Sequence, residues 1–492
     1  MIARGPNRLK NQNHRGVWAE LADRVTGGLA VATGIFLLCI GNGCDALSPI
    51  EKVSDGSSRD AGPSNRTQDK SQHGHLSDGN LGSMRRPGPD RLGESRFLRA
   101  PKLESLEVPD YKGANSIWGA TGRDSKGMIY FGVAAYGVDN PSAALWRLDP
   151  SSDTFETLGL VNEQLDRLKI RRRIDWPETQ MKIHSKIYQA ADGRIYFSSQ
   201  DEHDEAYDGS RNALYGGRIF ALEPKTNTWE CIHTTPEGLI ALSARGRYVV
   251  AQGYFGHVLY QYDTQTKQMR SKKLGTYKGH ASRNIFMDAR GHVYGIRARI
   301  ADSSEFEGVY ELDADRVRVS LVELDTLLQE VNDWPLGDYA PTGNTDSHGI
   351  TGFCEFNDGT IVFVTHSGAL WQVRQQGGKS QLDRLGWMHP QGSSYCASLF
   401  APYGNKFVCG FVNRKEGAYE WSVFDLQNKC SAVLPLDRQS AELLQHPKLL
   451  IYGCDTLDDT NRAYVVGWKL RGKKYVPNAV RMSPHVIRLS WE

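Results

Sequence analysis

The chain has 492 residues, with 59 lysines and arginines against 57 aspartates and glutamates, so its formal net charge is +2. This near balance excludes a strongly basic nucleic-acid-binding protein and an acidic, solvating chain. The 50 glycines, 21 tyrosines and 11 tryptophans are typical of a turn-rich, aromatic sequence, and they favour an all-β fold over a helical bundle.

Residues 1–44 are predicted to be a signal peptide or a single membrane anchor. An apolar run, Val25–Ile40, follows a basic front. It is longer than the core of a typical signal peptide and slightly shorter than the roughly 20 residues of a comfortable membrane span. The positive-inside rule then places the rest of the chain outside the cytoplasm. The protein is therefore expected to be secreted, periplasmic or anchored to a membrane.

Residues 45–95 are predicted to be a disordered linker. The stretch Ser48–Ser95 is rich in Ser, Asp, Gly, Arg, Asn and Pro and has almost no aliphatic residues. It cannot bury enough apolar surface to offset the entropy lost on ordering. Six cysteines follow the leader, too few and too scattered for a disulfide framework.

From Arg96 onward, one pattern recurs seven times: a turn with Gly or Asn, then a short alternating β run. The runs are centred on Ile129, Ile195, Tyr248, Val293, Ile361, Phe407 and Tyr464. Most are followed by a second strand that ends near an Asp or a polar turn, such as Leu145–Asp149. The spacing of 45 to 68 residues suits a four-stranded blade. Residues 96–492 are therefore predicted to form a seven-bladed β-propeller; the alternative is a large sandwich or two stacked β domains.

The ends of the propeller and two connections invite more specific predictions. Leu103–Val108 is a candidate clasp against Val486–Ser490, because a closed ring needs one blade shared or held by both chain ends. Val161–Ile170 and Val322–Val331 are expected to be short helical insertions between blades.

Metal-type residues stand at equivalent positions, at or just before the innermost strands of four blades. They are His184, His280, His348 and Cys396. A ring of blades would bring them around one axis. A thiolate and two imidazoles suit a borderline-soft cation, so His280, His348 and Cys396 are predicted to hold a structural zinc ion. The alternative is an ordinary polar lining of the central channel.

A second group of residues lies in blades 2 and 3. His203 follows His184 by 19 residues, and Arg270 follows Tyr254 by 16. Taken singly, they suggest a surface histidine, a packing tyrosine and a solvated arginine. As a series, they resemble the seven-bladed propeller polysaccharide lyases, most closely the ulvan lyases, with one departure: Gln200 stands where the second histidine would be expected.

The resemblance implies catalytic roles for His184, His203, Tyr254 and Arg270, and a metal at the propeller centre held by His280, His348 and Cys396. The substrate would be an acidic, sulfated polysaccharide that contains uronic acid. β-Elimination removes the C5 proton once a cation neutralises the C6 carboxylate, and His or Tyr can transfer the protons. The aromatic rings of Trp118, Tyr254 and Tyr395 could stack on sugars. No nucleic-acid partner is expected, and the protein is expected to be a monomer.

Two other functions fit the same sequence. A non-catalytic exported propeller could bind glycan or protein, because a fold does not determine a function. A streptogramin-lyase-like enzyme would share the His348-Gly349-Ile350 motif, but the paired carboxylate series it needs is not found in the sequence.

Overall fold

The computed structural model describes residues 98–203, 205, 211–275, 282–336, 349–415, 418–445, 449–455, 457–458, 460–470 and 482–491. The predicted leader and linker lie outside these residues, and the export and anchor predictions stay predictions. Among the described residues, no helix has the length and apolar character needed to cross a membrane.

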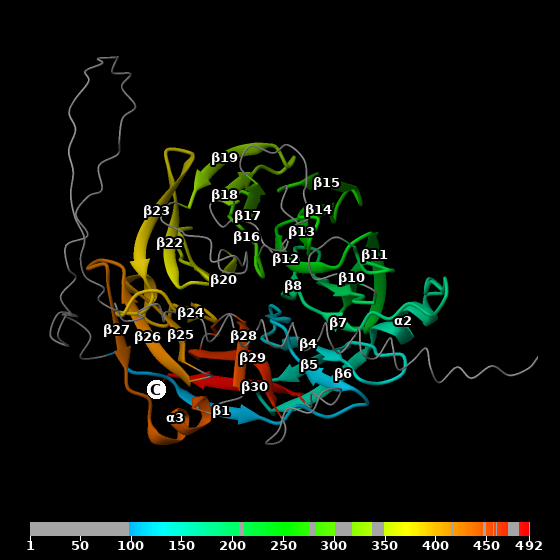
Figure 1. Cartoon of the computed structure of the whole chain (residues 1–492), viewed down its shortest axis with the longest axis horizontal. Helices are drawn as coiled ribbons and strands as arrows, with labels where there is room; N and C mark the ends of the chain where they lie inside the picture. The colour runs from blue at the N-terminus through cyan, green and yellow to red at the C-terminus, as the bar shows by residue number, and fades with distance from the viewer. Residues whose placement is uncertain are drawn as a thin grey trace, which may run out of the picture.

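Seven antiparallel sheets stand around one axis, which confirms the predicted seven-bladed β-propeller (Figure 1). From the innermost strand outward, blades 1 to 3 are β2 (Ala114–Ser116) with β3 (Thr121–Arg123), β4 (Ile129–Ala135), β5 (Ala144–Asp149) and β6 (Thr154–Leu160); β7 (Lys182–Ile183) with β8 (Tyr188–Gln189), β9 (Ile195–Gln200), β10 (Gly217–Glu223) and β11 (Thr228–Thr235); and β12 (Leu239–Arg245), β13 (Tyr248–Gly253), β14 (Val258–Asp263) and β15 (Met269–Lys273).

Blades 4 to 7 follow the same order. They are β16 (Phe286–Met287), β17 (Val293–Ile300), β18 (Val317–Leu324) and β19 (Glu330–Pro335); β20 (Ile350–Glu355), β21 (Ile361–Thr365), β22 (Ala369–Gln376) and β23 (Lys379–Trp387); β24 (Tyr395–Cys396), β25 (Phe407–Lys415), β26 (Ala418–Asp425) and β27 (Cys430–Leu434); and β28 (Leu449–Cys454), β29 (Arg462–Leu470), β30 (Met482–Ser490) and β1 (Lys102–Leu106). A short 3₁₀ helix, Gly404–Lys406, precedes β25.

The turn between the first and second strands of a blade explains the repeated sequence pattern. In blade 1, the Asp124 carboxylate accepts the N–H of Lys126 at 2.9 Å and the Tyr130 hydroxyl at 3.0 Å. The same hydroxyl contact recurs in two other blades, as Tyr196–Asp192 at 2.8 Å and Tyr294–Asp288 at 3.0 Å. One carboxylate thus closes the turn and pairs the buried phenol of the second strand.

The turn between the third and fourth strands uses a second aspartate. The Oδ1 atoms of Asp149, Asp263 and Asp425 each accept the backbone N–H two residues later, at 2.8 to 3.0 Å. These are the aspartates that end the repeated strand motif in the sequence. A local side-chain bond of this kind ends each strand and starts the hairpin.

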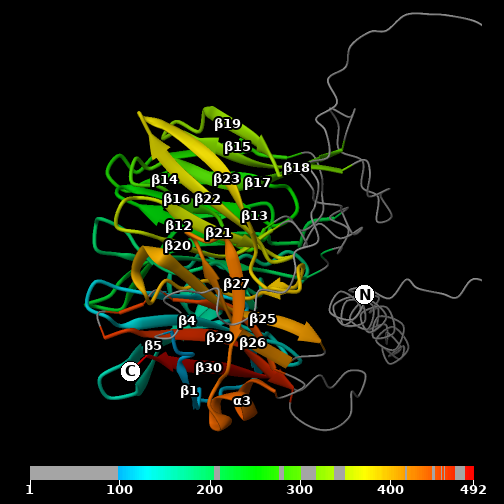
Figure 2. The ribbon, with the colours of Figure 1, turned by 90° about the vertical axis from the view of Figure 1, so that its left-hand side faces the viewer.

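Blade 7 closes the ring with strands from both ends of the described chain, as predicted. The first strand, β1, pairs antiparallel with β30, so that Leu103 lies opposite Leu489 and Leu106 opposite Val486. A short helix, α3 (Arg438–Leu444), lies beside β1, and its Ser440 hydroxyl accepts the N–H of Leu103 at 2.9 Å (Figure 2). The clasp is therefore held by a strand pair on one side and a helix contact on the other.

One of the two predicted helical insertions is confirmed and the other is wrong. Helix α2 (Val161–Arg167) occupies the first. The second stretch, Val322–Val331, is instead a hairpin between β18 and β19. The Asp325 carboxylate accepts N–H groups of its own turn, and Leu328 adopts a positive φ of 59°. Pairing with the second strand of blade 4, Val322 opposite Gly295, overrides the helical spacing of its apolar residues.

Replacing Leu103 with alanine should destabilise the whole propeller. The side chain is 2% exposed and belongs to a core cluster that joins both ends of the described chain. Its removal is expected to lower the free energy of unfolding by about 2–5 kcal/mol. Lys102→Ala, on the exposed side of the same strand, is the control and should change it by less than about 1 kcal/mol. Equal losses in both variants, measured by denaturant unfolding, would contradict the clasp.

Candidate functional site

Side chains from five blades meet near the propeller axis and form what is here named the axial cluster. Its members are Trp118, His184, Tyr254, Arg283 and Tyr452. They come from blades 1, 2, 3, 4 and 7. His184 and Tyr254 were predicted to belong to one site, and the structure brings them together with a ring-centroid distance of 5.9 Å.

The contact between His184 and Arg283 defines the chemical state of the imidazole. Arg283 Nη1 lies 3.1 Å from His184 Nε2, and the histidine is 2% exposed. A guanidinium has donors and no acceptor, so Nε2 must accept this bond. His184 is therefore a neutral imidazole whose Nε2 lone pair faces the guanidinium.

Arg283 also stacks on an aromatic ring. Its Cζ atom is 5.0 Å from the ring centroid of Tyr452, which is buried on β28. A cation over the face of a phenol is held by the ring quadrupole. Arg283 is thus fixed between a histidine of blade 2 and a tyrosine of blade 7, at the place where the sequence analysis expected a cation from Arg270.

Trp118 and Lys182 extend the cluster on the side of blades 1 and 2. The Trp118 ring meets His184 edge-on at 6.3 Å and Tyr452 at 5.1 Å. Lys182 Nζ lies 4.5 Å from the centroid of Trp118 and pairs with Glu202 Oε1 at 2.7 Å. Two cation–aromatic contacts therefore stand side by side at the axis.

His366 and Tyr395 lie next to Arg283 from blades 5 and 6. Their ring centroids are 4.6 Å apart. Burial lowers the pKa of His366 to about 3, and the charge of Arg283 lowers it further. Burial also raises the pKa of Tyr395 well above its usual value. Both side chains keep some solvent-accessible surface, as expected for the wall of a narrow channel, and both are uncharged at neutral pH.

The other two residues of the predicted series lie elsewhere. Arg270 is on β15, the outermost strand of blade 3, and three strand spacings of about 4.8 Å separate that strand from β12 at the axis. His203 is exposed, and its ring lies 4.9 Å from that of Trp176. The structure therefore does not bring Arg270 into the axial cluster and gives His203 a different neighbour.

Arg283 was missed, although its signal was in the sequence. It stands three residues after His280, in the stretch that leads into the innermost strand of blade 4. The sequence analysis considered only the metal-type residue of that stretch. An inner-strand arginine was a better candidate for the cation than one on an outer strand.

The zinc prediction falls largely outside the described residues. His280 and His348 are not among them. Cys396 is buried in an apolar cluster with residues of blades 5 and 6, and its thiol donates to the Ser398 carbonyl oxygen at 3.2 Å. Burial raises the pKa of this thiol to about 12. The placement gives Cys396 no evident role as a thiolate ligand, and the zinc site stays a prediction.

One group of described residues has the composition of a metal site: Asp288, His292 and Glu323. An internal cation already stands between its carboxylates. Arg290 Nη2 lies 2.5 Å from Asp288 Oδ2 and 2.7 Å from Glu323 Oε1. This guanidinium also contacts Ser380 of the next blade at 2.7 Å, so the group is a clamp between blades 4 and 5.

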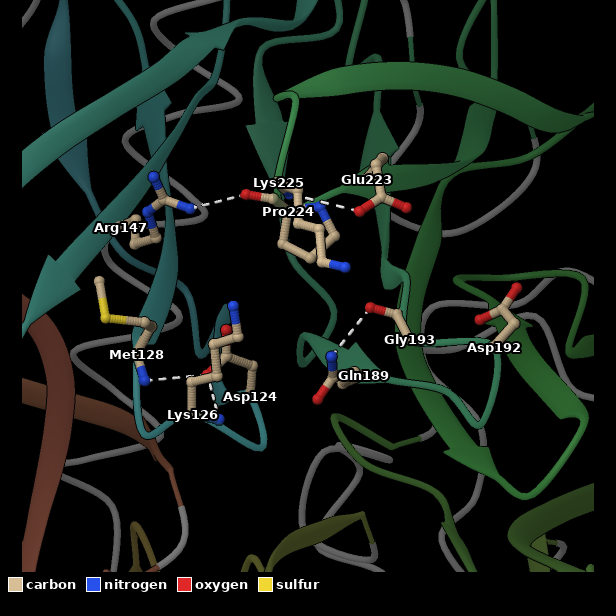
Figure 3. A pocket seen from close by; sticks show the side chains of 10 residues that line it. All are labelled: Asp124, Lys126, Met128, Arg147, Gln189, Asp192, Gly193, Glu223, Pro224 and Lys225. Carbon is tan, nitrogen blue, oxygen red and sulfur yellow. Dashed lines mark hydrogen bonds between the residues drawn. The ribbon is translucent and has the colours of Figure 1, made fainter.

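A hollow of about 430 Å³ lies between blades 1 and 2, on the face formed by the turns between first and second strands (Figure 3). Its carboxylates are already used. Asp124 and Asp192 hold their own turns, and Glu223 accepts the N–H of Lys225 at 3.3 Å. The lining thus shows turn chemistry, in contrast to the axial cluster, where side chains of distant blades face one another.

Comparison with known proteins supplies a fold and no family. No protein-family model and no curated protein sequence matches the chain. Three similar solved structures are Sqt1 from Chaetomium thermophilum (12% identity, TM-score 0.46, covering 80% of this chain and 91% of that one), YCF48 from Cyanidioschyzon merolae (9%, 0.43, 79% and 98%), and an α-L-arabinanase from Penicillium chrysogenum complexed with arabinobiose (10%, 0.43, 80% and 98%). The propeller is confirmed by its own sheet topology, and no family match connects the chain with the ulvan lyases.

A buried carboxyl group near the site should make stability depend on pH. Asp201 is 0% exposed and accepts the N–H groups of His203 and Tyr215 and the Thr179 hydroxyl, each at 3.1 Å. Burial raises its pKa to about 7, and these hydrogen bonds oppose the rise. The folded state therefore holds the proton more tightly than the unfolded chain, whose aspartates titrate near 4.

Asp201 should thus contribute stability at low pH that is lost as the pH rises from about 4 to about 7. We expect Asp201→Asn to reduce the fall in Tm between about pH 5 and pH 8, measured by calorimetry. Asp139→Asn, an exposed aspartate, is the matched control and should keep the wild-type fall. An unchanged pH dependence in Asp201→Asn would contradict this assignment.

Proposed function

We propose that the axial cluster binds an acidic polysaccharide and cleaves it by β-elimination beside a uronic acid. The observation that carries the proposal is the meeting of three groups at one place: a guanidinium, a neutral imidazole at 3.1 Å from it, and a phenol whose ring is 5.9 Å from the imidazole. Elimination needs a cation for the carboxylate, a base for the C5 proton and an acid for the leaving oxygen.

In this proposal, Arg283 binds the C6 carboxylate of the uronate. Ion pairing withdraws charge from the carboxylate and makes the C5 proton more acidic. The guanidinium donors turn to the substrate, which releases the lone pair of His184 Nε2 to accept that proton. The C5–H bond breaks, a C4–C5 double bond forms, and the C4–O bond breaks.

Tyr254 is the acid that completes the step. Its hydroxyl gives a proton to the departing O4, so that the chain leaves with a free hydroxyl group. His184 then holds one proton and Tyr254 lacks one, and exchange with water restores both. The rings of Trp118 and Tyr452 supply flat apolar faces beside these groups, on which sugar rings can stack.

Two further properties belong to the same proposal. A protein that degrades such a polymer would work outside the cytoplasm, and the basic, apolar leader predicted over residues 1–44 supports this. The wall residues His366 and Tyr395 are uncharged, so they do not compete with the substrate carboxylate for Arg283.

The test is the release of unsaturated uronate, followed by its ultraviolet absorbance on a panel of acidic polysaccharides. His184→Ala and Tyr254→Phe should lower the rate about 10²–10⁴-fold. Arg283→Ala should lower it about 10²–10³-fold, by analogy with the loss of an oxyanion donor. Arg270→Ala is the matched control, because the side chain lies on an outer strand, and it should keep the wild-type rate.

Three outcomes would contradict parts of the proposal. A wild-type protein that binds these polymers and releases no unsaturated product is a binding propeller. A rate lost in Arg270→Ala and kept in Arg283→Ala would restore the residues that the family resemblance implies. A full rate in Tyr254→Phe would remove that tyrosine from the proton transfers.

A further inference from the structure

Glu237 is a buried carboxyl group that lies directly beside the Tyr254 segment. It belongs to the connection between β11 of blade 2 and β12 of blade 3, and it is 3% exposed. Its Oε2 atom accepts the N–H of Gly256 at 2.6 Å, and the Tyr260 hydroxyl lies 3.5 Å from Oε1. Its own carbonyl oxygen accepts the Thr235 hydroxyl at 2.7 Å. Both the backbone and the side chain of Glu237 are therefore fixed.

The chain between β13 and β14 is wrapped around this carboxylate. The N–H groups of Gly256, Val258 and Phe255 all lower the pKa of Glu237, although burial outweighs them and raises it to about 7. A Cβ atom on Gly253 would lie 2.1 Å from Glu237 Cδ, and one on Gly256 would lie 2.7 Å from Oε1. Only glycine leaves room for the carboxylate at these two positions.

Tyr254 lies between those two glycines. Its N–H donates to the carbonyl oxygen of Gly238, the neighbour of Glu237, at 2.8 Å. At the other end of the segment, His257 is buried, and its positive φ of 52° turns the chain back into β14. One connection therefore holds the tyrosine through its backbone on one side and through a carboxylate on the other.

We propose that Glu237 is a positioning residue, which holds the segment Tyr254–His257 so that the phenol of Tyr254 stays beside His184. The proposal rests on the proposed function for its consequence in catalysis, while the anchoring itself can be measured without any activity. Glu237 touches no reacting atom in this scheme. It acts through Tyr254, as second-layer contacts do when they fix a reactive group in place.

Three charged or titratable groups face Glu237 from the elements packed around it or interact with it through charge. Tyr260 comes from β14, and the charge of Glu237 raises its pKa. Glu205 follows β9, and the charges of Glu202 and Glu237 help to raise its pKa. Lys182 is the cation that opposes this effect. None of them bonds to the segment Tyr254–His257 in place of Glu237.

The experiment compares Glu237→Gln with the wild-type protein by hydrogen exchange. An amide retains one acceptor and places N–H donors against the N–H groups of the segment. We expect exchange at Phe255, Gly256 and Val258 to quicken by about tenfold or more, with the rest of blade 3 unchanged. Glu178→Gln is the matched control: Glu178 is equally buried, bonds to Arg218 instead, and should not open this segment.

Kinetics supply the second readout. If the positioning role is right, Glu237→Gln should lower kcat by about 10²-fold and leave KM near the wild-type value, because a misplaced phenol fails in the chemical step and not in binding. Combining it with Tyr254→Phe should cause little further loss, since both changes remove the same contribution.

Each result decides a separate part. Unchanged exchange at Phe255–Val258 in Glu237→Gln overturns the anchoring even if the wild type is an active lyase. Faster exchange spread over the whole propeller overturns it as well, because Glu237 would then be a general core residue. A locally opened segment in a protein without lyase activity would support the anchoring and reject the proposed function.

Discussion

A ring of blades is stable only if its first and last units meet, and this closure is the constraint on which the rest of the molecule depends. The pairing of β1 with β30 buries Leu103 and Leu106 and leaves no free edge at the junction. A buried ion pair crosses the same junction: Arg123 Nη2 lies 2.5 Å from Asp455 Oδ2, joining blades 1 and 7. Burial raises the pKa of Asp455 to about 6, and Arg123 opposes the rise.

Closure also explains why the axial cluster exists at all. His184 and Arg283 are separated by 99 residues, and Arg283 and Tyr452 by still more, yet each pair is in contact. Neither pair belongs to neighbouring blades. Only a complete ring directs innermost strands from opposite sides toward one axis, so the site is a property of the assembled propeller and not of any one blade.

Buried carboxyl groups set the geometry of the connections around this site. Asp201 accepts backbone N–H groups from the connection that follows β9, and Glu237 accepts one from the connection that follows β13. These are the blades that supply His184 and Tyr254. In both cases burial opposes the charged form, and the hydrogen bonds partly offset that cost. Donors and acceptors arranged before substrate arrives are what an electrostatic mechanism requires.

The sequence by itself determined the propeller, the number of blades, the clasp between Leu103–Val108 and Val486–Ser490, and the helix at Val161–Arg167. These follow from local signals: aspartate and glycine at turns, alternation along strands, and their repetition. The pairing of His184 with Tyr254 was also within reach, because both lie where strands of adjacent blades begin or end at one face.

The tertiary structure alone decided which cation joins them. Arg270 and Arg283 are similar in sequence terms, since each lies near a strand of the right blades. The first is on an outermost strand and the second leads into an innermost one, and sequence spacing does not measure distance from the axis. The same limit applies to Val322–Val331, whose apolar spacing suits a helix until strand pairing in blade 4 turns it into a hairpin. It also applies to Cys396, whose strand position leaves open whether the thiol faces the axis or the apolar core between blades, where it lies. Local patterns specify elements, and only packing specifies which side chains meet.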